Sequence, residues 1–423
     1  MVELTQHQEQ ALQEMLAFEK SDKKMFLLNG SAGTGKTTLI GEYCRRSSKQ
    51  VILSGPTHKS SHVLQSKSIG YDVSTIHSLL NLTLEYEKDK TILVQRETKT
   101  KKSKTGNYLS TVVVDEASML SDELISYIRA DIARNNNRYI FVGDHCQLPP
   151  VDYDVSPVYN IVDAKFELTN IIRQAAGNPI IKLATAIRDM IQTGIIRDFE
   201  FEENDIGSVQ SIDIGELIKL AKHYYRSSDY ESNADFVKIT AFTNEAVNKY
   251  NHFINKLFKV PEYESFIIGS KVVFNEAFAK GQRVIVPNNA EGTVKSIKKH
   301  VRDGIFFDTL EIDFEDGIVL DPKWSGSFDV IQQNSVSDYK RILNAIKSDA
   351  IRYKSWHKYY AYKDLYQDIR PNFSSTVHKL QGSTIDHIII DLNDIMKCRD
   401  KNLLLKMLYV AVTRGAKNCY ILS

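Results

Sequence analysis

The strongest chemical signal in the sequence is a glycine-rich loop near the N-terminus. Residues 25–40 read MFLLNGSAGTGKTTLI, and Gly30 to Thr37 fit the pattern G-x-x-x-x-G-K-T. The backbone N–H groups of such a loop bind phosphates, its lysine reaches the outer phosphates, and its hydroxyl binds Mg²⁺. We therefore expect ATP and Mg²⁺ to bind at the loop residues Gly33, Thr34, Gly35, Lys36, Thr37 and Thr38.

The residues around this loop place it in the structural context that its chemistry requires. The apolar run before Gly30 predicts a buried strand, and the residues after Lys36 predict a helix. Kinases, GTPases and motor ATPases all share this strand, loop and helix. The loop alone therefore indicates a nucleotide site without choosing among these classes.

Two further stretches supply side chains for the same chemistry. TVVVDEASML, residues 111–120, is a β-branched run that ends in Asp115 and Glu116. We expect Asp115 to hold Mg²⁺ together with Thr37, and Glu116 to polarise the attacking water as a general base. RYIFVGDHCQLPPV, residues 138–151, predicts another strand, and we expect Gln147 to contact the γ-phosphate or the water. A strand that delivers two carboxylates at its end is the expected partner of a phosphate-binding loop.

Nine motifs follow one another along the chain in an order that resembles a known family. They read GSAGTGKTT, PTHKS, STIHSLL, DEAS, GDHCQLPPV, LTNIIRQ, AFTN, STVHKLQGSTID and LYVAVTRG. In order, spacing and flanks they resemble superfamily 1 helicases and, among these, the RecD-like 5′→3′ branch, superfamily 1B. The resemblance extends from about residue 4 to residue 423. It implies two RecA-like domains with ATP in the cleft between them and a DNA strand as the track.

The resemblance also assigns nucleotide-binding roles to residues outside the loop. Arg414 and Arg173 resemble the arginines that such helicases bring to the γ-phosphate, where a guanidinium stays charged and binds in a bidentate manner. Gln8 resembles the glutamine of the Q motif, whose amide matches the adenine edge. Gln381 and Gly382 resemble the part of their motif that faces the nucleotide. The residues alone leave open a helix-end cap for Arg414, a surface position for Arg173 and an exposed helix start for Gln8.

Polar residues at the ends of several predicted strands are candidates for the DNA track. Hydroxyl, imidazole and amide groups bind phosphate and sugar without reading sequence, which suits a motor that moves along a strand. Each of these residues alone could equally be an ordinary loop residue without a role in DNA binding. The same kind of polar cluster recurs in both predicted RecA-like domains, and this recurrence favours a DNA track. The candidates are Thr57, His58, Lys59, Thr75, His77, Thr243, Asn244, Thr376, His378 and Lys379.

We expect an α/β fold of two RecA-like P-loop domains, each carrying an insertion. The first domain should span residues 1–165, with a small β-hairpin insertion at about 81–110. The second should comprise residues 166–265 and 373–423. Between these two parts, residues 266–372 alternate polar and apolar residues and then form a long helical stretch. That region resembles the SH3-like barrel, with a helical extension, that this branch inserts.

Composition limits the partners and the surroundings of the chain. Lys and Arg number 54 against 53 Asp and Glu, so a nucleic-acid site must be a local groove rather than a basic surface. The four cysteines are scattered without a C-x-x-C pair, which fits a reducing compartment and argues against zinc. No apolar run predicts a membrane span. We expect a cytoplasmic monomer, in the host cytoplasm if the chain is phage-encoded.

These patterns together predict an ATP-dependent DNA helicase that moves 5′→3′ on single-stranded DNA and unwinds forked duplex DNA. The resemblance suggests a phage role in replication or recombination, with replication or single-strand-binding proteins as further partners. One alternative is a single-strand translocase that displaces proteins but unwinds poorly, because the insertion contains no Phe or Trp to stack on a base pair. A second alternative, from another class, is a P-loop kinase.

Overall fold

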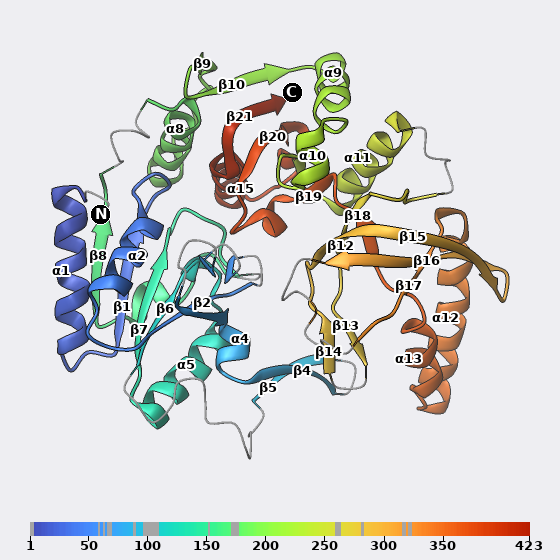
Figure 1. Ribbon diagram of the computed structural model, residues 1–423, viewed down its shortest axis with the longest axis horizontal. Coiled ribbons are helices and arrows are strands. Elements are labelled where there is room, and N and C mark those ends of the chain that lie inside the picture. Colours follow the sequence, from blue (N-terminus) through green and yellow to red (C-terminus); the bar gives the residue numbers. More distant parts are fainter. Residues whose placement is uncertain are drawn as a thin grey trace. The chain divides into compact units, whose positions relative to one another are not determined.

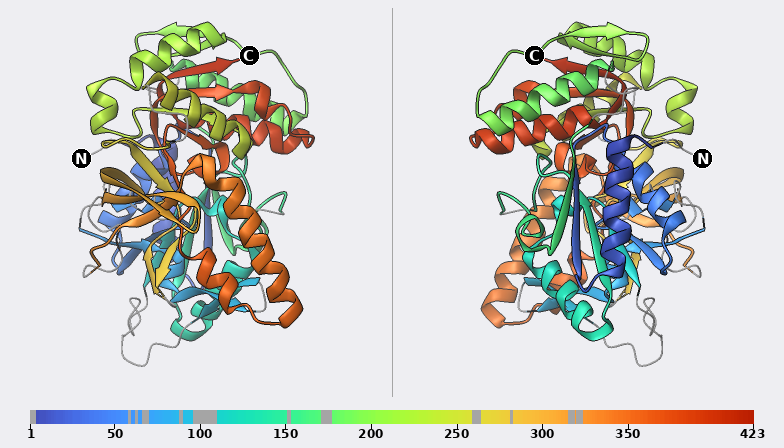
Figure 2. Two further views of the ribbon diagram at one scale, coloured as in Figure 1. Left: turned by 90° about the vertical axis from the view of Figure 1, so that its right-hand side faces the viewer. Right: turned by 90° about the vertical axis from the view of Figure 1, so that its left-hand side faces the viewer.

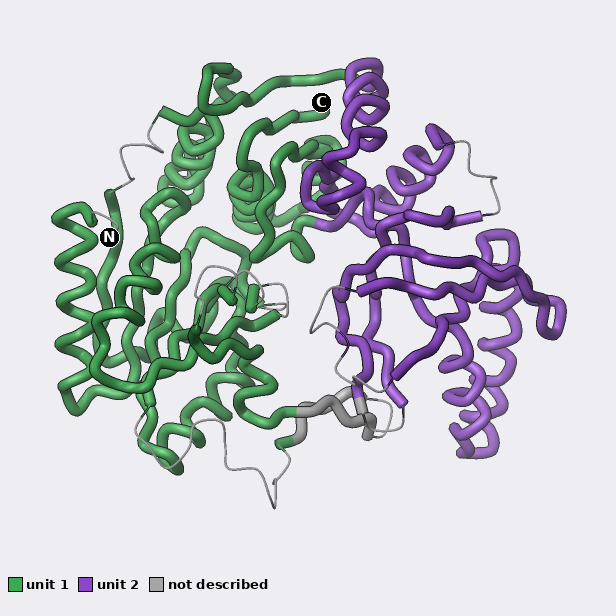
Figure 3. The backbone as a smooth tube through the Cα atoms, viewed as in Figure 1, with its two compact units in different colours: residues 1–213, 377–423 green, residues 214–376 purple. Residues whose placement is uncertain are grey.

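The chain folds into two compact units, here described from a computed structural model (Figures 1 and 3). Unit 1 comprises residues 1–213 and 377–423, and unit 2 comprises residues 214–376. The structure describes residues 4–57, 60–61, 64–65, 70–87, 90–95, 110–150, 153–170, 177–258, 264–280, 283–314, 319 and 324–423. Among these residues, no helix combines the length and the apolar character needed to cross a membrane.

The first sheet of unit 1 contains six parallel strands in the order β3-β2-β6-β7-β1-β8. Its four inner strands are rich in Val, Ile, Leu and Phe and are buried on both faces, as a parallel sheet covered by helices requires, whereas the two edge strands are partly exposed. The strands are β1 (Met25–Gly30), β2 (Val51–Gly55), β3 (Asp72–Thr75), β6 (Thr111–Val114), β7 (Arg138–Gly143) and β8 (Ala164–Leu168).

Helices cover both faces of this sheet, and alternate residues of each strand point to opposite sides. Phe26 and Leu28 belong to one hydrophobic cluster, whereas Met25 and Leu27 belong to the cluster on the other face. This period of two is the expected geometry of a strand. The flanking elements of the sheet are α1 (Gln6–Lys20), α2 (Lys36–Arg46), α4 (Ile76–Leu79), η1 (Ala117–Met119), α5 (Asp122–Asn135) and α6 (Val158–Ile161).

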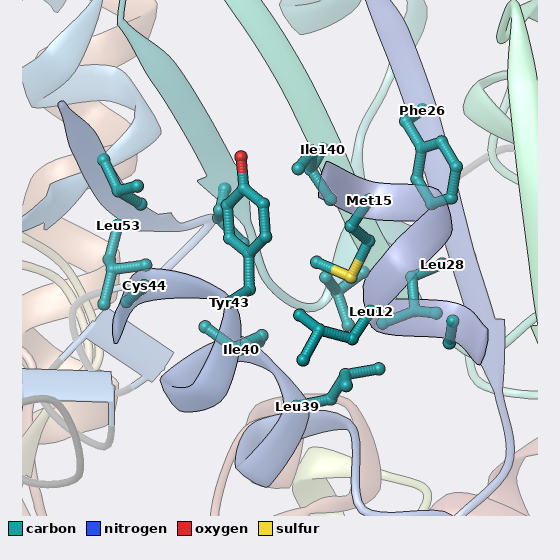
Figure 4. Close-up of a cluster of buried hydrophobic side chains, with 14 of the residues drawn as sticks. Leu12, Met15, Phe26, Leu28, Leu39, Ile40, Tyr43, Cys44, Leu53 and Ile140 are labelled. Atoms are coloured by element: carbon teal, nitrogen blue, oxygen red, sulfur yellow. The ribbon is translucent and has the colours of Figure 1, made fainter. Parts of the chain in front are cut away.

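Helix α1 packs on the same face of the sheet as α2, and Figure 2 shows it running beside β1. Thr5 and Gln8 form a capping box, in which each side chain accepts a hydrogen bond from the other residue's backbone N–H. Leu12 and Met15 on its inner side are fully buried among the side chains drawn in Figure 4. A capped amphipathic helix therefore covers the strand that leads into the phosphate loop.

A second sheet of unit 1 is formed by segments from both parts of its chain. Strand β21 pairs in parallel with β10 on one side and with β20 on the other, and β9 pairs antiparallel with β10. The elements are α8 (Pro179–Thr193), β9 (Glu202–Asn204), β10 (Gly207–Ile212), η3 (Val377–Leu380), β20 (Ile385–Asp391), α14 (Leu392–Ile395), α15 (Lys401–Arg414) and β21 (Gly415–Leu422).

Unit 2 contains a parallel strand pair, an antiparallel sheet and a helical hairpin. β11 (Val237–Ala241) pairs with β19 (Ser374–Thr376), and the five-stranded sheet has the order β17-β16-β15-β12-β18. Its strands are β12 (Lys271–Phe274), β15 (Glu291–Arg302), β16 (Ile305–Phe314), β17 (Phe328–Ile331) and β18 (Ile369–Pro371). The other elements are α9 (Ile214–Tyr224), α10 (Ser228–Ser232), α11 (Asn244–Leu257), β13 (Phe278–Lys280), β14 (Arg283–Val286), η2 (Gln333–Ser335), α12 (Val336–Tyr353) and α13 (His357–Lys363).

The predicted α/β fold with parallel sheets is confirmed, whereas the predicted barrel is not. Among the described residues, β13 and β14 pair only with each other, and the five-stranded sheet stays open between β17 and β18. The insertion in the first part of the chain does form a β-hairpin, of β4 (Leu82–Glu87) and β5 (Lys90–Gln95). The two compact units are divided at other residues than the predicted domains, whose boundaries stay a prediction.

The packing of α1 generates a stability prediction. Met15→Ala should lower the free energy of unfolding by about 2–5 kcal/mol, because Met15 is fully buried and its truncation leaves a cavity. Met396 is 59% exposed in the same unit, so Met396→Ala should change the free energy by less than about 0.5 kcal/mol. Urea denaturation followed by circular dichroism measures both variants. Equal midpoints for the two would show that α1 does not belong to the core of unit 1.

Candidate nucleotide site and strand-binding residues

The glycine-rich loop runs from the end of β1 to the start of α2. Gly33 and Gly35 both have a φ of +79°, in the left-handed region that residues with a Cβ rarely adopt. Lys36 is the first residue of α2, and its Nζ donates to the carbonyl oxygens of Gly30, at 2.5 Å, and Ser31, at 3.0 Å. The loop therefore wraps around its own lysine, so that a cation lies among its backbone groups.

Gln8 links helix α1 to this loop. Its Oε1 accepts from the backbone N–H of Thr5 at 3.0 Å, and its Nε2 donates to the carbonyl oxygen of Thr34 at 3.1 Å. The side chain is buried, with only 4% of its surface exposed. Both ends of the Gln8 amide therefore have protein partners, and its expected contact with adenine stays a prediction.

Asp115 and Glu116 follow β6, at the same edge of the sheet as the loop. The backbone N–H of Asp115 donates to the carbonyl oxygen of Ser54, and its Oδ1 accepts from the backbone N–H of Glu116 at 2.9 Å. Glu116 has a φ of +52° and a ψ of +42°, a left-handed conformation that costs a residue with a side chain about 1–2 kcal/mol. Unfavourable backbone of this kind is concentrated at functional sites. It fits the expected role of Glu116 as the catalytic base.

Arg414 is brought to Glu116 from the opposite end of the chain. It is the last residue of α15, and one of its terminal nitrogens lies 3.6 Å from Glu116 Oε1. The same nitrogen donates to the carbonyl oxygen of Ser383 at 3.3 Å. The Arg414 side chain is only 9% exposed, so this is a buried guanidinium next to a carboxylate rather than a surface helix cap.

Two glutamines lie next to the same edge. Gln147 is 5% exposed, and its backbone N–H donates to the carbonyl oxygen of Asp144 at 3.0 Å. Gln381 Nε2 donates to the carbonyl oxygen of Leu148 at 3.1 Å. The segment that begins at Gln381 thus contacts the segment that follows β7, and the neighbouring Gly382 has a φ of +76°.

Tyr409 and Asp144 form a connection that the sequence analysis did not identify. The Tyr409 hydroxyl accepts from the backbone N–H of Ala32 at 3.1 Å and donates to Asp144 Oδ2 at 2.6 Å. Both residues stand within motifs that the sequence analysis quoted, but an apolar helical strip gives no sign of which ring has a polar partner.

Asp144, His145 and Cys146 also place three potential ligand atoms within 4.8 Å of one another. Burial raises the pKa of the Cys146 thiol to about 12, which opposes metal binding there because thiolate is the ligand.

Buried polar atoms around this edge fit a strongly polar ligand. Among the described residues, several such atoms have no hydrogen-bond partner within the protein, although buried polar groups usually have one. They are Ser31 Oγ, Ser54 Oγ, Ser118 Oγ, Gln147 Oε1, Ser383 Oγ and Arg414 Nε. Phosphate oxygens accept from hydroxyls and guanidinium, and Mg²⁺ binds hydroxyl and carboxylate oxygens of the kind that Thr37 and Asp115 offer. The residues present therefore fit ATP with Mg²⁺.

Two of the threonines expected on the DNA track begin helices, and a third makes a hydrogen bond of the same pattern. Thr57 Oγ1 accepts from the backbone N–H of Ser60 at 3.1 Å, Thr75 Oγ1 from Ser78 at 3.2 Å and Thr243 Oγ1 from Ala246 at 3.2 Å. The contacts of Thr75 and Thr243 are N-caps, which threonine favours irrespective of any ligand. A helix start also presents N–H groups to phosphate, so the caps leave strand binding possible as a prediction.

The remaining candidates for the DNA track differ in whether the structure describes them and in how deeply they are buried. His58 and Lys59, like Arg173 of the nucleotide site, lie outside the described residues. His77 and Lys379 are partly buried, Asn244 is exposed at the start of α11, and Thr376 is buried at the end of β19. His378 lies in η3, where burial lowers the pKa of its imidazole. Any contact that His378 makes near neutral pH therefore uses a neutral ring.

Comparisons with known proteins agree with this geometry. Residues 3–204 match the family model of an AAA domain, and residues 372–422 match that of the UvrD-like helicase C-terminal domain. The chain is similar to the ATP-dependent DNA helicase dda of Enterobacteria phage T4, with 27% identity over 98% of both chains. It is also similar to the ATP-dependent RecD2 DNA helicase of Deinococcus radiodurans, with 31% identity over 38% of this chain and 21% of that protein.

Solved structures show the same fold. A Pif1 helicase structure on DNA unwinding at forked duplex DNA has a TM-score of 0.55 and 17% identity, over 99% of this chain and 92% of that one. Pif1 from Bacteroides in complex with ADP-AlF3 and single-stranded DNA has a TM-score of 0.50 and 16% identity, over 99% and 92%. At these identities the likeness concerns the fold alone.

The buried pair of Arg414 and Glu116 generates a kinetic prediction. Arg414→Ala should lower kcat for ATP hydrolysis by roughly 10³-fold, because a guanidinium stabilises charge that develops during phosphoryl transfer. The affinity for ADP should change far less. Steady-state ATPase and fluorescence titration with a labelled ADP measure the two effects. Lys417→Ala is the control, because Lys417 is 61% exposed and forms an ion pair with Asp386 at the surface of the same unit. Equal loss of turnover and of ADP affinity would indicate a structural role for Arg414.

Proposed function

We propose that this chain is an ATP-dependent DNA helicase of superfamily 1B. One observation carries the proposal more than any other. Arg414, in the stretch that matches a helicase C-terminal domain, lies 3.6 Å from Glu116, which follows the strand beside the phosphate loop. A P-loop kinase needs an acceptor pocket and has no use for an arginine supplied by a helicase C-terminal motif.

Each residue at the edge of the sheet has a role in hydrolysis. Lys36 and the loop N–H groups bind the phosphates, and Glu116 orients and deprotonates the attacking water. Thr37 and Asp115 hold Mg²⁺, which neutralises phosphate charge when it is bound. Arg414 then turns from Glu116 to the γ-phosphate, and Gln147 and Gln381 respond to the presence of that phosphate. Arg173 is the second arginine of this set, and Gln8 is the adenine contact.

The motor moves 5′→3′ on single-stranded DNA and opens forked duplexes. The polarity rests on the resemblance to superfamily 1B, and the substrates are those of the related helicases. The strand contacts the polar residues expected from the sequence, which are Thr57, His58, Lys59, Thr75 and His77 and, in unit 2, Thr243, Asn244 and Thr376. His378 and Lys379 complete this set. Contacts of this kind are independent of sequence and suit a chain of net charge +1.

Several finer features belong to the same proposal. Residues 266–372 form an SH3-like module with the α12–α13 extension, and the domain boundaries are those expected from the sequence. The chain acts as a monomer in the cytoplasm, the host cytoplasm in the case of a phage, in replication or recombination. Replication or single-strand-binding proteins are its partners. The long antiparallel pair of β15 and β16 supports the SH3-like reading of this region.

The composition of the hairpin favours one alternative within the same class. Strands β4 and β5 contain Tyr86 as their only aromatic residue. β4 ends at Glu87 and β5 begins at Lys90, so the apolar residues Ile92, Leu93 and Val94 lie along β5 rather than at the connection. Neither strand contains a Phe or a Trp that could stack on a base pair, which favours weak unwinding of duplexes. The alternative is a translocase that displaces proteins from single strands, and a forked-duplex assay with a blunt duplex as control distinguishes it.

The first test is steady-state ATP hydrolysis with and without a single-stranded DNA oligonucleotide. A DNA-tracking motor should show a large stimulation of kcat by DNA and a smaller one by RNA of the same sequence. Unwinding of duplexes with a 5′ tail, but not of those with a 3′ tail, then fixes the polarity. Absence of stimulation by either strand would reject the motor and favour the kinase, which a phosphorylated product would identify.

Lys36→Ala is expected to abolish ATP hydrolysis and leave oligonucleotide binding within about threefold of the wild type. Removal of the ammonium deletes a phosphate contact, but the predicted strand contacts come from other residues. Fluorescence anisotropy with a labelled oligonucleotide and a phosphate-release assay measure the two properties. Wild-type turnover in this variant would reject the loop as the nucleotide site.

His378→Ala should raise the oligonucleotide concentration needed for half-maximal stimulation by about 3- to 10-fold, as expected for one lost contact of roughly 1 kcal/mol. Because burial lowers the pKa of His378 below its ordinary value, this effect should be the same at pH 7.5 and pH 8.5. His252→Ala, on α11 in unit 2, is the control. An unchanged activation constant would remove His378 from the track, and an effect confined to the lower pH would contradict a neutral contact.

A further inference from the structure

Three segments that carry the nucleotide chemistry meet at a single hydroxyl group. Tyr409 lies in α15, five positions before Arg414. Its hydroxyl accepts from the backbone N–H of Ala32 in the phosphate loop at 3.1 Å, and it donates to Asp144 Oδ2 after β7 at 2.6 Å. The loop, the end of β7 and the arginine-bearing helix are thus joined through two hydrogen bonds of one side chain, all of them within unit 1.

We propose that Tyr409 is a positioning residue that sets the distance from Arg414 and Gln147 to the phosphate loop. The proposal rests on hydrolysis of ATP at the site described above. Arg414 moves with Tyr409 because both belong to one helix. Gln147 is included because its backbone N–H donates to the carbonyl oxygen of Asp144 at 3.0 Å. The contact of Tyr409 with Asp144 and Ala32 therefore positions both Arg414 and Gln147, the two groups proposed to contact the γ-phosphate, relative to the phosphate loop.

Burial makes this contact strong and hard to replace. Tyr409 and Asp144 each have an exposed fraction of 1%. A buried carboxylate must receive hydrogen bonds to stay ionised at low cost, and Asp144 receives them from the Tyr409 hydroxyl and from the backbone N–H of Cys146 at 3.1 Å. The bond to Tyr409 is charge-assisted and short, as expected for a phenol that donates to a carboxylate. Water has no direct access to take over either partner.

The contact also provides a route from the nucleotide to the arginine. The Ala32 N–H of the phosphate loop donates to Tyr409, whereas other N–H groups of such a loop point at the bound phosphate, so a change in the loop on phosphate binding is passed to this bond. A movement of the Ala32 N–H shifts the Tyr409 hydroxyl to which it donates. Tyr409 lies on α15, the helix that also carries Arg414. Tyr409 therefore turns a local change in the loop into a displacement of α15, without touching ATP itself. This is why it is a positioning residue and not a catalytic one.

The test is Tyr409→Phe, which keeps the ring and removes both hydrogen bonds. Misplacement of a catalytic group by about 1 Å can cost roughly 100-fold, so basal kcat without oligonucleotide should fall about 10- to 100-fold. The KM for ATP should stay within about threefold, because the loop contacts with phosphate remain. Affinity for ADP with aluminium fluoride, which mimics the transferred phosphoryl group, should fall more than affinity for ADP alone.

The chain offers a matched control in Tyr139→Phe. Tyr139 is also fully buried in unit 1, and its hydroxyl donates to Asp131 Oδ2 at 2.7 Å, a pair of the same chemistry that lies against α5. Tyr139→Phe loses one buried bond from tyrosine to carboxylate, and Tyr409→Phe loses such a bond together with the one from Ala32, so the unfolding midpoint should fall in both variants and at least as far in Tyr409→Phe. Only Tyr409→Phe should change kcat and the ratio of the two ADP affinities.

A double-mutant cycle separates positioning of Arg414 from a general effect. If Tyr409 acts through the arginine, Tyr409→Phe should cost much less in kcat when it is combined with Arg414→Lys than when it is made alone. Full additivity, or equal losses in the Tyr139→Phe control, would overturn the proposal. So would an unchanged basal kcat together with an unchanged ratio of affinities. Because these measurements use no oligonucleotide, a failure of strand stimulation would reject the helicase assignment and not this role of Tyr409.

Discussion

The site depends on the parallel register of the first sheet. Ser54 pairs with Val114, Val114 with Phe141, and Asn29 with Gly143, so that neighbouring strands end at the same level. The phosphate loop, the two carboxylates and the segment that contains Gln147 follow these ends directly. In a parallel sheet the carboxyl ends share one edge, and a ligand is bound outside that edge. Without this register, residues of the site that are more than 80 positions apart in the sequence would not lie close together.

Sequence alone predicted the parts of this arrangement that short motifs encode. The loop from Gly30 to Thr37 has a fixed spacing, because only certain backbone turns present N–H groups to phosphate, and its context of strand and helix is confirmed. The resemblance to superfamily 1B helicases, inferred from the order of nine motifs, is confirmed by the similarity to the dda helicase, with 27% identity over 98% of the chain. The roles of individual residues such as Arg414 stay predictions, although its position beside Glu116 is compatible with the expected one.

Sequence could not predict what depends on three-dimensional packing. The sequence predicts Thr75 and Thr243 as strand-end residues of the track, and the structure shows that both cap helices, because a small hydroxyl at such a position suits either role. Tyr409 sits in an apolar helical strip where most rings fill the core, and only the fold shows that its hydroxyl meets Asp144. The alternating pattern of residues 266–372 predicted antiparallel strands correctly, but closure of a barrel depends on strand ends that the pattern does not encode.

Unit 2 interrupts unit 1 in the sequence, and this affects the order in which the protein can assemble during synthesis. A ribosome releases residues 214–376 before residues 377–423, so unit 2 can fold while unit 1 still lacks the strand that pairs with both β10 and β20. Closing that strand pair joins segments more than 200 positions apart, a contact of high order that forms slowly. Arg414 and Tyr409 arrive with this last segment. The nascent chain therefore possesses a phosphate loop and Glu116 long before it possesses Arg414 and Tyr409, and a nucleotide bound at that stage would be hydrolysed only slowly.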